Sequence, residues 1–258
     1  MSTLVVTVVQ ADLLWQDAAG NRRHFTTVIE DLQEPADLIV LPEMFTTGFS
    51  MDAAELAETM DGDSVAWMRK MAASSNAAVC GSLIIADNQQ YFNRFICASP
   101  AGDLQCYDKR HLFRLAHEQD HYAAGADLLT FELKGWRICP LVCYDLRFPV
   151  WSRNRDSYDL LLYVANWPER RHRAWETLLR ARAIENQSYV AGVNRTGSDG
   201  NDIPYIGGSA IIDHLGEDLA NLGDQTGTVS VELDLEQLRV FRERFAFHKD
   251  ADSFTLGS

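Results

Sequence analysis

The chain has 258 residues, and its 37 acidic side chains against 23 lysines and arginines give a formal net charge of −14. Proteins that hold nucleic acid neutralise phosphates with clustered cations, so we expect no nucleic-acid partner for a chain of this charge. Hydrophobic residues make up 47% of the chain and charged residues 23%, as in globular proteins with a large core. This composition excludes disordered and fibrous classes.

The longer apolar runs, such as DLLLYVA from Asp159, stop far short of the roughly 18 to 20 residues that cross a bilayer. The start MSTLVVTVVQADL has no basic region and does not resemble a secretory signal. The five cysteines are an odd number without zinc-type CxxC spacing. We therefore expect a cytoplasmic protein with no membrane partner, no metal site and mostly reduced core thiols.

Strand-length apolar runs alternate with helical patterns along the whole chain, without a linker rich in Pro, Gly or Ser. The pattern predicts a single domain over residues 1–258. From Ala77, short apolar runs separated by DNQQ and PAGD predict antiparallel hairpins. Before them we predict strands over Leu4–Gln10 and Asp37–Leu41 and helices over Asn21–Gln33 and Asp63–Ser75.

The second half continues the mixed α/β pattern. About ten to twelve strands with four or five helices exceed what one doubly wound sheet holds. Two packed mixed sheets covered by helices accommodate them, which predicts a four-layer αββα sandwich. The predicted strands here are Leu128–Leu133, Arg137–Val142, Leu160–Val164, Tyr189–Val193, Gly208–Asp213 and Thr228–Leu233, and the predicted helices are Trp151–Arg155, Trp175–Asn186 and Leu235–Arg244.

Three polar side chains stand where predicted strands end, the place where α/β proteins carry their working residues. Glu43 follows VLP, Lys109 lies in QCYDKRHLFR, and Cys143 lies where the strand RICPLV turns toward a helix. A thiol at such an elbow lies near helix N-terminal N–H groups, which lower its pKa and can hold an oxyanion. Each segment alone also has a structural interpretation: Glu43 as a carboxylate that caps a strand end, Lys109 as part of a solvated charge cluster, and Cys143 as an inert buried thiol. The last is our interpretation of Cys80, Cys97 and Cys139.

Three strings together resemble the nitrilase superfamily of carbon–nitrogen hydrolases: LPEMFTTGF around Glu43, YDKRHLF around Lys109 and PLVCYDLRFP around Cys143, in that order. The later segments LLLYVANWPERR, RARAIENQSYVAGVNRTG and GGSAIIDHLGE agree, so the resemblance covers essentially the whole chain. Within the superfamily the chain is similar to the omega-amidase-like branch, whose members deamidate 2-oxo dicarboxylic acid monoamides such as 2-oxoglutaramate. The resemblance implies an αββα fold, a homodimer, no cofactor, and for Glu118 the role of the family's second acidic residue.

Amide hydrolysis needs a strong nucleophile, a proton shuttle and a site for negative charge on oxygen, because a carboxamide is a poor electrophile with a poor leaving group. We predict Cys143 as the nucleophile and Glu43 as base and acid in turn. Lys109 and the backbone N–H of Tyr144 are expected to stabilise the tetrahedral intermediate. Glu118 is expected to orient Lys109 or the water that hydrolyses the thioester.

The substrate pocket is expected to involve the loop after the strand next to the nucleophile, where Asn166 and Trp167 follow. An omega-amide substrate carries a distal carboxylate, which a cation must face. The run PERRHRAW offers Arg170, Arg171 and Arg173 for a bidentate clamp. A solvated basic run before a helix is the alternative interpretation.

Other reaction classes explain less of this sequence. A papain-like protease needs a histidine base and a local cysteine signature, which none of the five cysteines has. The string HEQDH from His117 to His121 matches the zinc pattern HExxH, but a zincin needs it on a continuous helix with a third ligand. Nitrilase activity through the same thiol is the nearest alternative. A non-catalytic binding protein of the same fold is the remote one, because Glu, Lys and Cys are all retained.

Overall fold

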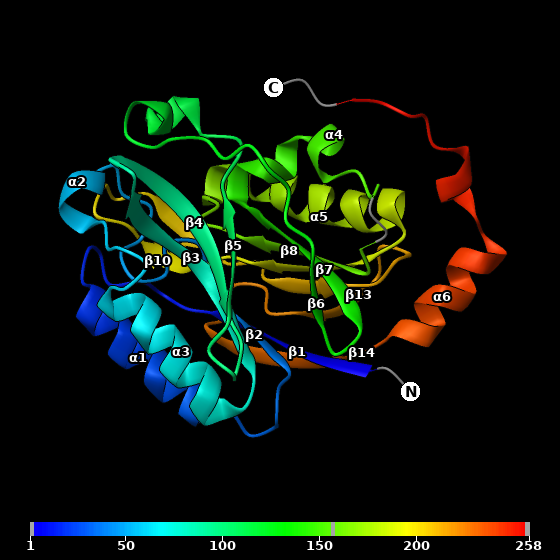
Figure 1. Ribbon diagram of the computed structural model, residues 1–258, viewed down its shortest axis with the longest axis horizontal. Helices are drawn as coiled ribbons and strands as arrows, with labels where there is room; N and C mark the ends of the chain where they lie inside the picture. The colour runs from blue at the N-terminus through cyan, green and yellow to red at the C-terminus, as the bar shows by residue number, and fades with distance from the viewer. Residues whose placement is uncertain (1–2, 156–157, 256–258) are drawn as a thin grey trace.

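Two six-stranded mixed sheets form the frame of the molecule (Figure 1), and the computed structural model describes residues 3–155 and 158–255. The first sheet has the order β14-β1-β2-β3-β4-β5, with β1, β2 and β3 parallel. Its strands are β1 (Thr3–Gln10), β2 (Leu38–Val40), β3 (Ala78–Asp87), β4 (Gln90–Ala98), β5 (Leu104–Asp108) and β14 (Gly227–Asp234).

The second sheet has the order β13-β12-β9-β8-β7-β6, with β7, β8 and β9 parallel. A short two-stranded ribbon, β10 with β11, lies outside both sheets. The strands of this sheet and ribbon are β6 (Phe131–Leu133), β7 (Trp136–Val142), β8 (Leu160–Val164), β9 (Tyr189–Val193), β10 (Thr196–Ser198), β11 (Pro204–Ile206), β12 (Ala210–Ile212) and β13 (Asp218–Asn221).

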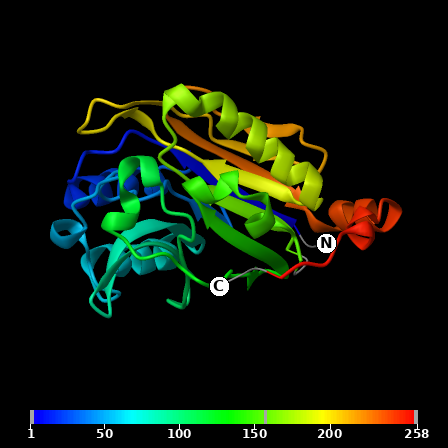
Figure 2. The same ribbon diagram turned by 90° about the horizontal axis from the view of Figure 1, so that it is seen from above.

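Helices cover the outer faces of the sheets. The helices α1 and α3 pack together on the first sheet, and α5 packs on β9 and β12 of the second, on the opposite side of the molecule (Figures 1 and 2). The predicted αββα sandwich is therefore confirmed. The helices are α1 (Ala18–Glu30), α2 (Ala53–Leu56), α3 (Asp63–Ser75), α4 (Pro149–Ser152), α5 (His172–Asn186) and α6 (Leu235–Arg244).

The core lies in two layers, which explains the uninterrupted apolar runs of the parallel strands. In β2, Leu38 and Val40 belong to the core cluster that the two sheets share, whereas Ile39 packs under α1 and α3. Successive side chains of a strand point to opposite faces, so a strand buried on both faces needs an apolar residue at every position. The run LIV meets this requirement.

Most predicted elements are present with shifted ends. Helix α1 begins at Ala18, before the predicted Asn21, because the Asp17 side chain accepts the Gly20 N–H and caps the helix. The strand predicted from Leu128 is reduced to β6, and the short elements α2, β10, β11 and β13 were not predicted. Part of the predicted domain, residues 1–2, 156–157 and 256–258, lies outside the described residues. Within the described part of the chain, no helix is long and apolar enough to cross a membrane.

Parallel strands bring the predicted site residues to one region. Glu43 follows β2, Cys143 follows β7 and Asn166 follows β8, all at carboxyl ends of parallel strands. Lys109 comes directly after β5 at the edge of the first sheet. Because the carboxyl ends of parallel strands open at the same end of a sheet, residues from both sheets meet there.

Candidate active site

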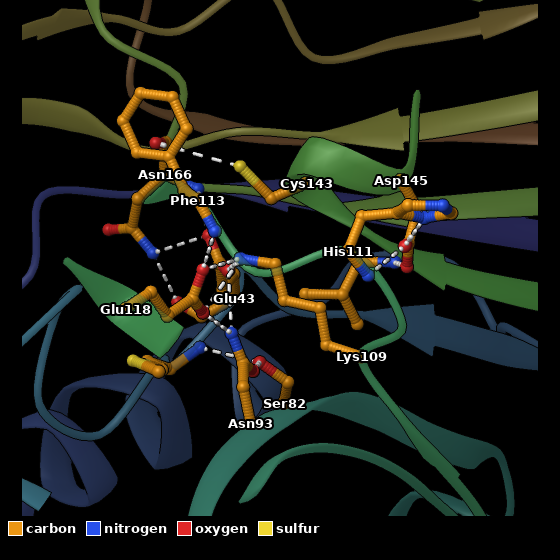
Figure 3. A network of polar contacts seen from close by, with 12 residues as sticks. Glu43, Ser82, Asn93, Lys109, His111, Phe113, Glu118, Cys143, Asp145 and Asn166 are labelled. Carbon is orange, nitrogen blue, oxygen red and sulfur yellow. Dashed lines mark hydrogen bonds and ion pairs between the residues drawn. The ribbon is translucent and has the colours of Figure 1, made fainter. Parts of the chain in front are cut away.

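The structure brings Glu43, Lys109, Glu118 and Cys143 together (Figure 3). The Lys109 Nζ lies 2.9 Å from Glu43 Oε1, and 2.9 and 3.0 Å from the two carboxylate oxygens of Glu118. The side chains of all three residues in this ion cluster are fully buried. The Lys109 ammonium is thus held between two acidic side chains in the interior, next to the thiol.

Glu43 is held in place by amide groups. Asn93 Nδ2 donates to Glu43 Oε1 over 2.7 Å, and the backbone N–H of Asn166 donates to Oε2 over 2.8 Å. Asn93 is in turn fixed by the Ser82 hydroxyl, which donates to its side-chain oxygen over 2.7 Å. Asn93 and Ser82 were not among the predicted site residues. The feature of the sequence that could have identified them is a polar residue within an otherwise apolar hairpin strand. Both residues are fully buried there.

Glu118 binds Lys109 from the other side. Its Oε2 also accepts the backbone N–H of Phe113 over 2.5 Å. Burial raises the pKa of Glu118, and the Glu43 carboxylate adds to this, while Lys109 acts in the opposite direction. For Lys109, burial alone lowers the pKa, but the carboxylates of Glu118 and Glu43 outweigh it and hold the pKa above its ordinary value. Lys109 is therefore an ammonium ion at neutral pH.

Cys143 stands at a sharp elbow between β7 and the 3-10 turn η3 (Cys143–Arg147). Its φ of 44° lies in the left-handed region, which is strained for a non-glycine residue and is common at functional sites. The Sγ atom lies 3.9 Å from the Asn166 carbonyl oxygen, and the Glu43 carboxylate is the charge that acts most strongly on the thiol. Tyr144 is the second residue of this turn, where backbone N–H groups have no acceptor within the helix.

The expected lowering of the Cys143 pKa is wrong. Burial, with the Glu43 carboxylate next in size, raises the pKa of the thiol well above its ordinary value, although Lys109 acts against this. The physical reason is that the elbow is enclosed, and that two carboxylates outweigh one ammonium. The resting nucleophile is thus a neutral thiol that needs a base.

A cavity of about 370 Å³ opens in front of Cys143 and Lys109. Asn166 and Trp167 line it, at the positions that the sequence predicted for the pocket. Tyr144 also lines it. Small-molecule sites are typically concave and of roughly 300 to 1,000 Å³, so the cavity suits a small substrate.

Of the three arginines that the sequence offered, Arg171 lines this cavity, and it is joined by Arg147, which was not predicted. Arg147 and Arg171 line it, with their guanidinium groups 5.0 Å above the Trp167 ring and 4.9 Å above the Phe113 ring. Among the described residues neither arginine forms an ion pair. Arg170 and Arg173 lie instead in a shallow depression outside, which Arg147 and Arg171 also border.

The HEQDH string does not form a metal-binding helix. His117 has a φ of 58° and separates two three-residue 3-10 turns, η1 (Arg114–Ala116) and η2 (Glu118–Asp120). The acid of the string, Glu118, points inward to Lys109. Across the described residues, no group of three or more His, Cys, Asp or Glu side chains is placed to hold a metal ion.

The comparisons with known proteins agree with this geometry. A family model described as carbon-nitrogen hydrolase matches residues 5–243. The chain is 51% identical to the omega-amidase YafV of Yersinia enterocolitica, over 99% of this chain and 100% of that one. It is 36% identical to the 2-oxoglutaramate amidase of Bacillus subtilis, over 95% and 96% of the two chains.

Solved structures show the same fold. XC1258 from Xanthomonas campestris, described as a CN-hydrolase superfamily protein, is 49% identical over 100% of both chains, with a TM-score of 0.97. Nit3 of Saccharomyces cerevisiae, a member of branch 10 of the nitrilase superfamily, is 25% identical over 94% of both chains, with a TM-score of 0.87. The chain belongs to the carbon–nitrogen hydrolase family, the nitrilase superfamily. Within it the chain falls in the omega-amidase-like branch, as the sequence motifs predicted, and it is a hydrolase of amides.

Proposed function

We propose that this enzyme hydrolyses the terminal carboxamide of a small 2-oxo dicarboxylic acid monoamide, 2-oxoglutaramate or 2-oxosuccinamate, to the acid and ammonia. The observation that carries the proposal is that Lys109, in contact with Glu43, and Cys143 line a small cavity together with Arg147 and Arg171. Relatives named omega-amidase and 2-oxoglutaramate amidase, similar over nearly the whole chain, support the substrate class.

In the first half of the reaction, Cys143 Sγ attacks the amide carbon while Glu43 takes the thiol proton. A C–S bond forms, and the carbonyl oxygen becomes an oxyanion next to the Lys109 ammonium and the Tyr144 N–H. Glu43 then gives its proton to the amide nitrogen, the C–N bond breaks, and ammonia leaves. A thioester on Cys143 remains.

In the second half, water hydrolyses the thioester. Glu43 removes a proton from the water as its oxygen attacks the thioester carbon, and the new oxyanion again lies next to Lys109. The C–S bond then breaks and the sulfur recovers the proton from Glu43, which restores the thiol and releases the acid. One carboxylate serves as base and acid in both halves, which is why it is held by Asn93 and Asn166 rather than left free to rotate.

Substrate selection follows from the Arg147 and Arg171 guanidinium groups, which form no ion pair with the residues that the structure describes. A guanidinium binds a carboxylate through two parallel N–H···O bonds, so Arg147 and Arg171 are suited to the distal carboxylate of an omega-amide. Cation–π contacts with Trp167 and Phe113 hold the two guanidinium groups at the cavity before substrate arrives. A simple nitrile or a neutral amide would reach the thiol without this contact and should be a poorer substrate.

The test is ammonia release by the purified protein from 2-oxoglutaramate and 2-oxosuccinamate, with glutamine, asparagine and a simple nitrile alongside. The Cys143→Ala variant is the blank. Release from the 2-oxo amides, lost in the variant, is the expected result. Preferred turnover of the nitrile would move the assignment to nitrilase, and silence on every substrate with an unreactive thiol would move it to the non-catalytic alternative.

We also propose that the enzyme is a cytoplasmic, single-domain homodimer. Support for pairing comes from Ile184 of α5 and Leu215 of the β12–β13 turn, which are 54% and 55% exposed. They are neighbours, since the end of the Ile184 side chain lies against Gly216. Light scattering of wild type and Leu215→Asp tests this: a dimer that the substitution splits is expected, and a monomeric wild type would contradict it.

A further inference from the structure

A second buried network lies beside the catalytic cluster, centred on Asp145. Its carboxylate is fully buried and accepts hydrogen bonds at both oxygens, and Figure 3 shows the contacts with His111. Oδ2 accepts the Tyr107 hydroxyl over 2.8 Å and the backbone N–H of Val142 over 3.0 Å. Oδ1 accepts the backbone N–H of His111 over 3.0 Å and lies 2.7 Å from His111 Nδ1, the geometry of a ring N–H donor.

The sequence positions of these partners are informative. Tyr107 and His111 stand two residues before and two residues after Lys109, and Asp145 stands two residues after Cys143. Lys109 follows β5 of the first sheet, whereas Cys143 follows β7 of the second. The Asp145 carboxylate therefore joins the segment that carries the ammonium to the elbow that carries the nucleophile.

Tyr107 and His111 are themselves held rigidly. The Tyr107 hydroxyl accepts Trp151 Nε1 over 3.0 Å and the Arg110 N–H over 3.2 Å. The His111 ring stacks on Phe148, with ring centroids 3.7 Å apart and planes 7° apart. A carboxylate that accepts four hydrogen bonds, with both side-chain donors held by neighbours, transmits a displacement of one segment to the other.

We propose that Asp145, Tyr107 and His111 are positioning residues for amide hydrolysis: they set the position of the Lys109 ammonium relative to the Cys143 sulfur. The inference rests on the proposed function. In the described part of the chain, none of these three residues lines the cavity, whereas the arginines expected to bind the substrate, Arg147 and Arg171, do. Loss of the network should therefore lower kcat and leave KM nearly unchanged.

The first experiment compares His111→Ala with His111→Asn. Both lose the stack on Phe148, but an asparagine side-chain N–H can take the place of Nδ1–H and donate to Asp145. Since misplacement of reacting groups by about 1 Å can cost 10²-fold, we expect His111→Ala to lower kcat about tenfold or more, with KM within about twofold. His111→Asn should recover most of kcat. Equal kcat in the two variants would overturn the role of the hydrogen bond.

The second experiment removes one buried hydroxyl with a matched control. Tyr107→Phe removes the donor to Asp145, whereas Tyr158→Phe removes a buried hydroxyl that donates to the Ser152 carbonyl and not to Asp145. Both should lower Tm, but only Tyr107→Phe should lower kcat. A kcat loss that is the same in both variants would show a merely structural role. If the wild type releases ammonia from no amide, the proposed function fails, whereas active variants with wild-type kcat overturn only the positioning role.

Discussion

The base of the cavity and its mouth hold their positive charges in opposite ways. At the base, Lys109 is fully buried between Glu43 and Glu118. At the mouth, Arg147 and Arg171 lie over aromatic rings and, among the described residues, pair with no carboxylate. This difference indicates that the two sets of cations have different roles. The Lys109 ammonium is already paired with carboxylates before the substrate binds, and it stabilises the oxyanion that forms during the reaction. Arg147 and Arg171 are instead available for the carboxylate of the substrate.

The largest effect is expected at the base. Lys109→Met should lower kcat by about 10²- to 10³-fold or more, because an oxyanion loses its preorganised partner. Steady-state ammonia release measures it. Wild-type turnover in this variant would contradict the role of Lys109.

The same variant should also be less stable. Without the ammonium, the Glu43 and Glu118 carboxylates face each other in a buried site, which should cost about 3 to 5 kcal/mol in urea unfolding at neutral pH. Because Lys109 lowers the Glu118 pKa more than any other group does, its loss raises that pKa further. The deficit should therefore shrink as the pH falls and the carboxylates bind protons. A deficit that grows toward acid pH would reverse this assignment.

At the mouth the expected effect is smaller and falls on binding. The double variant Arg147→Gln/Arg171→Gln should raise KM for 2-oxoglutaramate about 10- to 100-fold, the value of a lost charged hydrogen bond, with kcat within about threefold. Arg170→Gln/Arg173→Gln removes the same charge from the depression outside and is the matched control. If the control raises KM more, Arg170 and Arg173 form the clamp instead.

A still smaller effect is expected on the reactivity of the Cys143 thiol. Glu43 is among the groups that raise the pKa of Cys143, so Glu43→Gln should move the pH profile of iodoacetamide alkylation to lower pH, even though turnover is lost. The rate of Cys143 modification between neutral and alkaline pH measures the shift. A profile displaced to higher pH would show that Glu43 stabilises the thiolate instead.

The smallest effect is expected at cysteines away from the elbow. Cys106→Ala and Cys139→Ala should leave kcat unchanged. Cys139 is buried in the core that the sheets share, so its substitution should cost about 1 kcal/mol of stability. Loss of turnover in either variant would mean that the nucleophile is not Cys143.

Much of the fold was predictable because its physical causes are local. Continuous apolar runs such as that of β8 indicate strands buried on both faces, and the turn residues between β3 and β5 indicate hairpins. Polar residues directly after such strands mark the carboxyl ends, which is how Glu43 and Cys143 could be singled out. Short elements such as β13, exposed and without a continuous apolar run, left no such signal.

The rest depended on which distant residues the fold brings together. Arg147 lies far from Arg171 in the sequence, and the two line one cavity only because the turns after β7 and β8 adjoin. The sequence therefore indicated only the run that contains Arg170, Arg171 and Arg173 as the source of a carboxylate-binding cation. Asn93 supports Glu43 across two strands, a contact that no spacing predicts. The pKa of Cys143 depends on a balance of burial and three charges, and only the structure gives its sign.

The central claim is that Cys143 carries the substrate as a thioester. Acid quenching of the wild type during turnover of 2-oxoglutaramate, followed by mass spectrometry of the peptide that contains Cys143, tests it most directly. The account predicts an added mass equal to that of the substrate less ammonia, on Cys143 alone and absent in Cys143→Ala. Full turnover with that adduct on another cysteine, or an active Cys143→Ala variant, would contradict it.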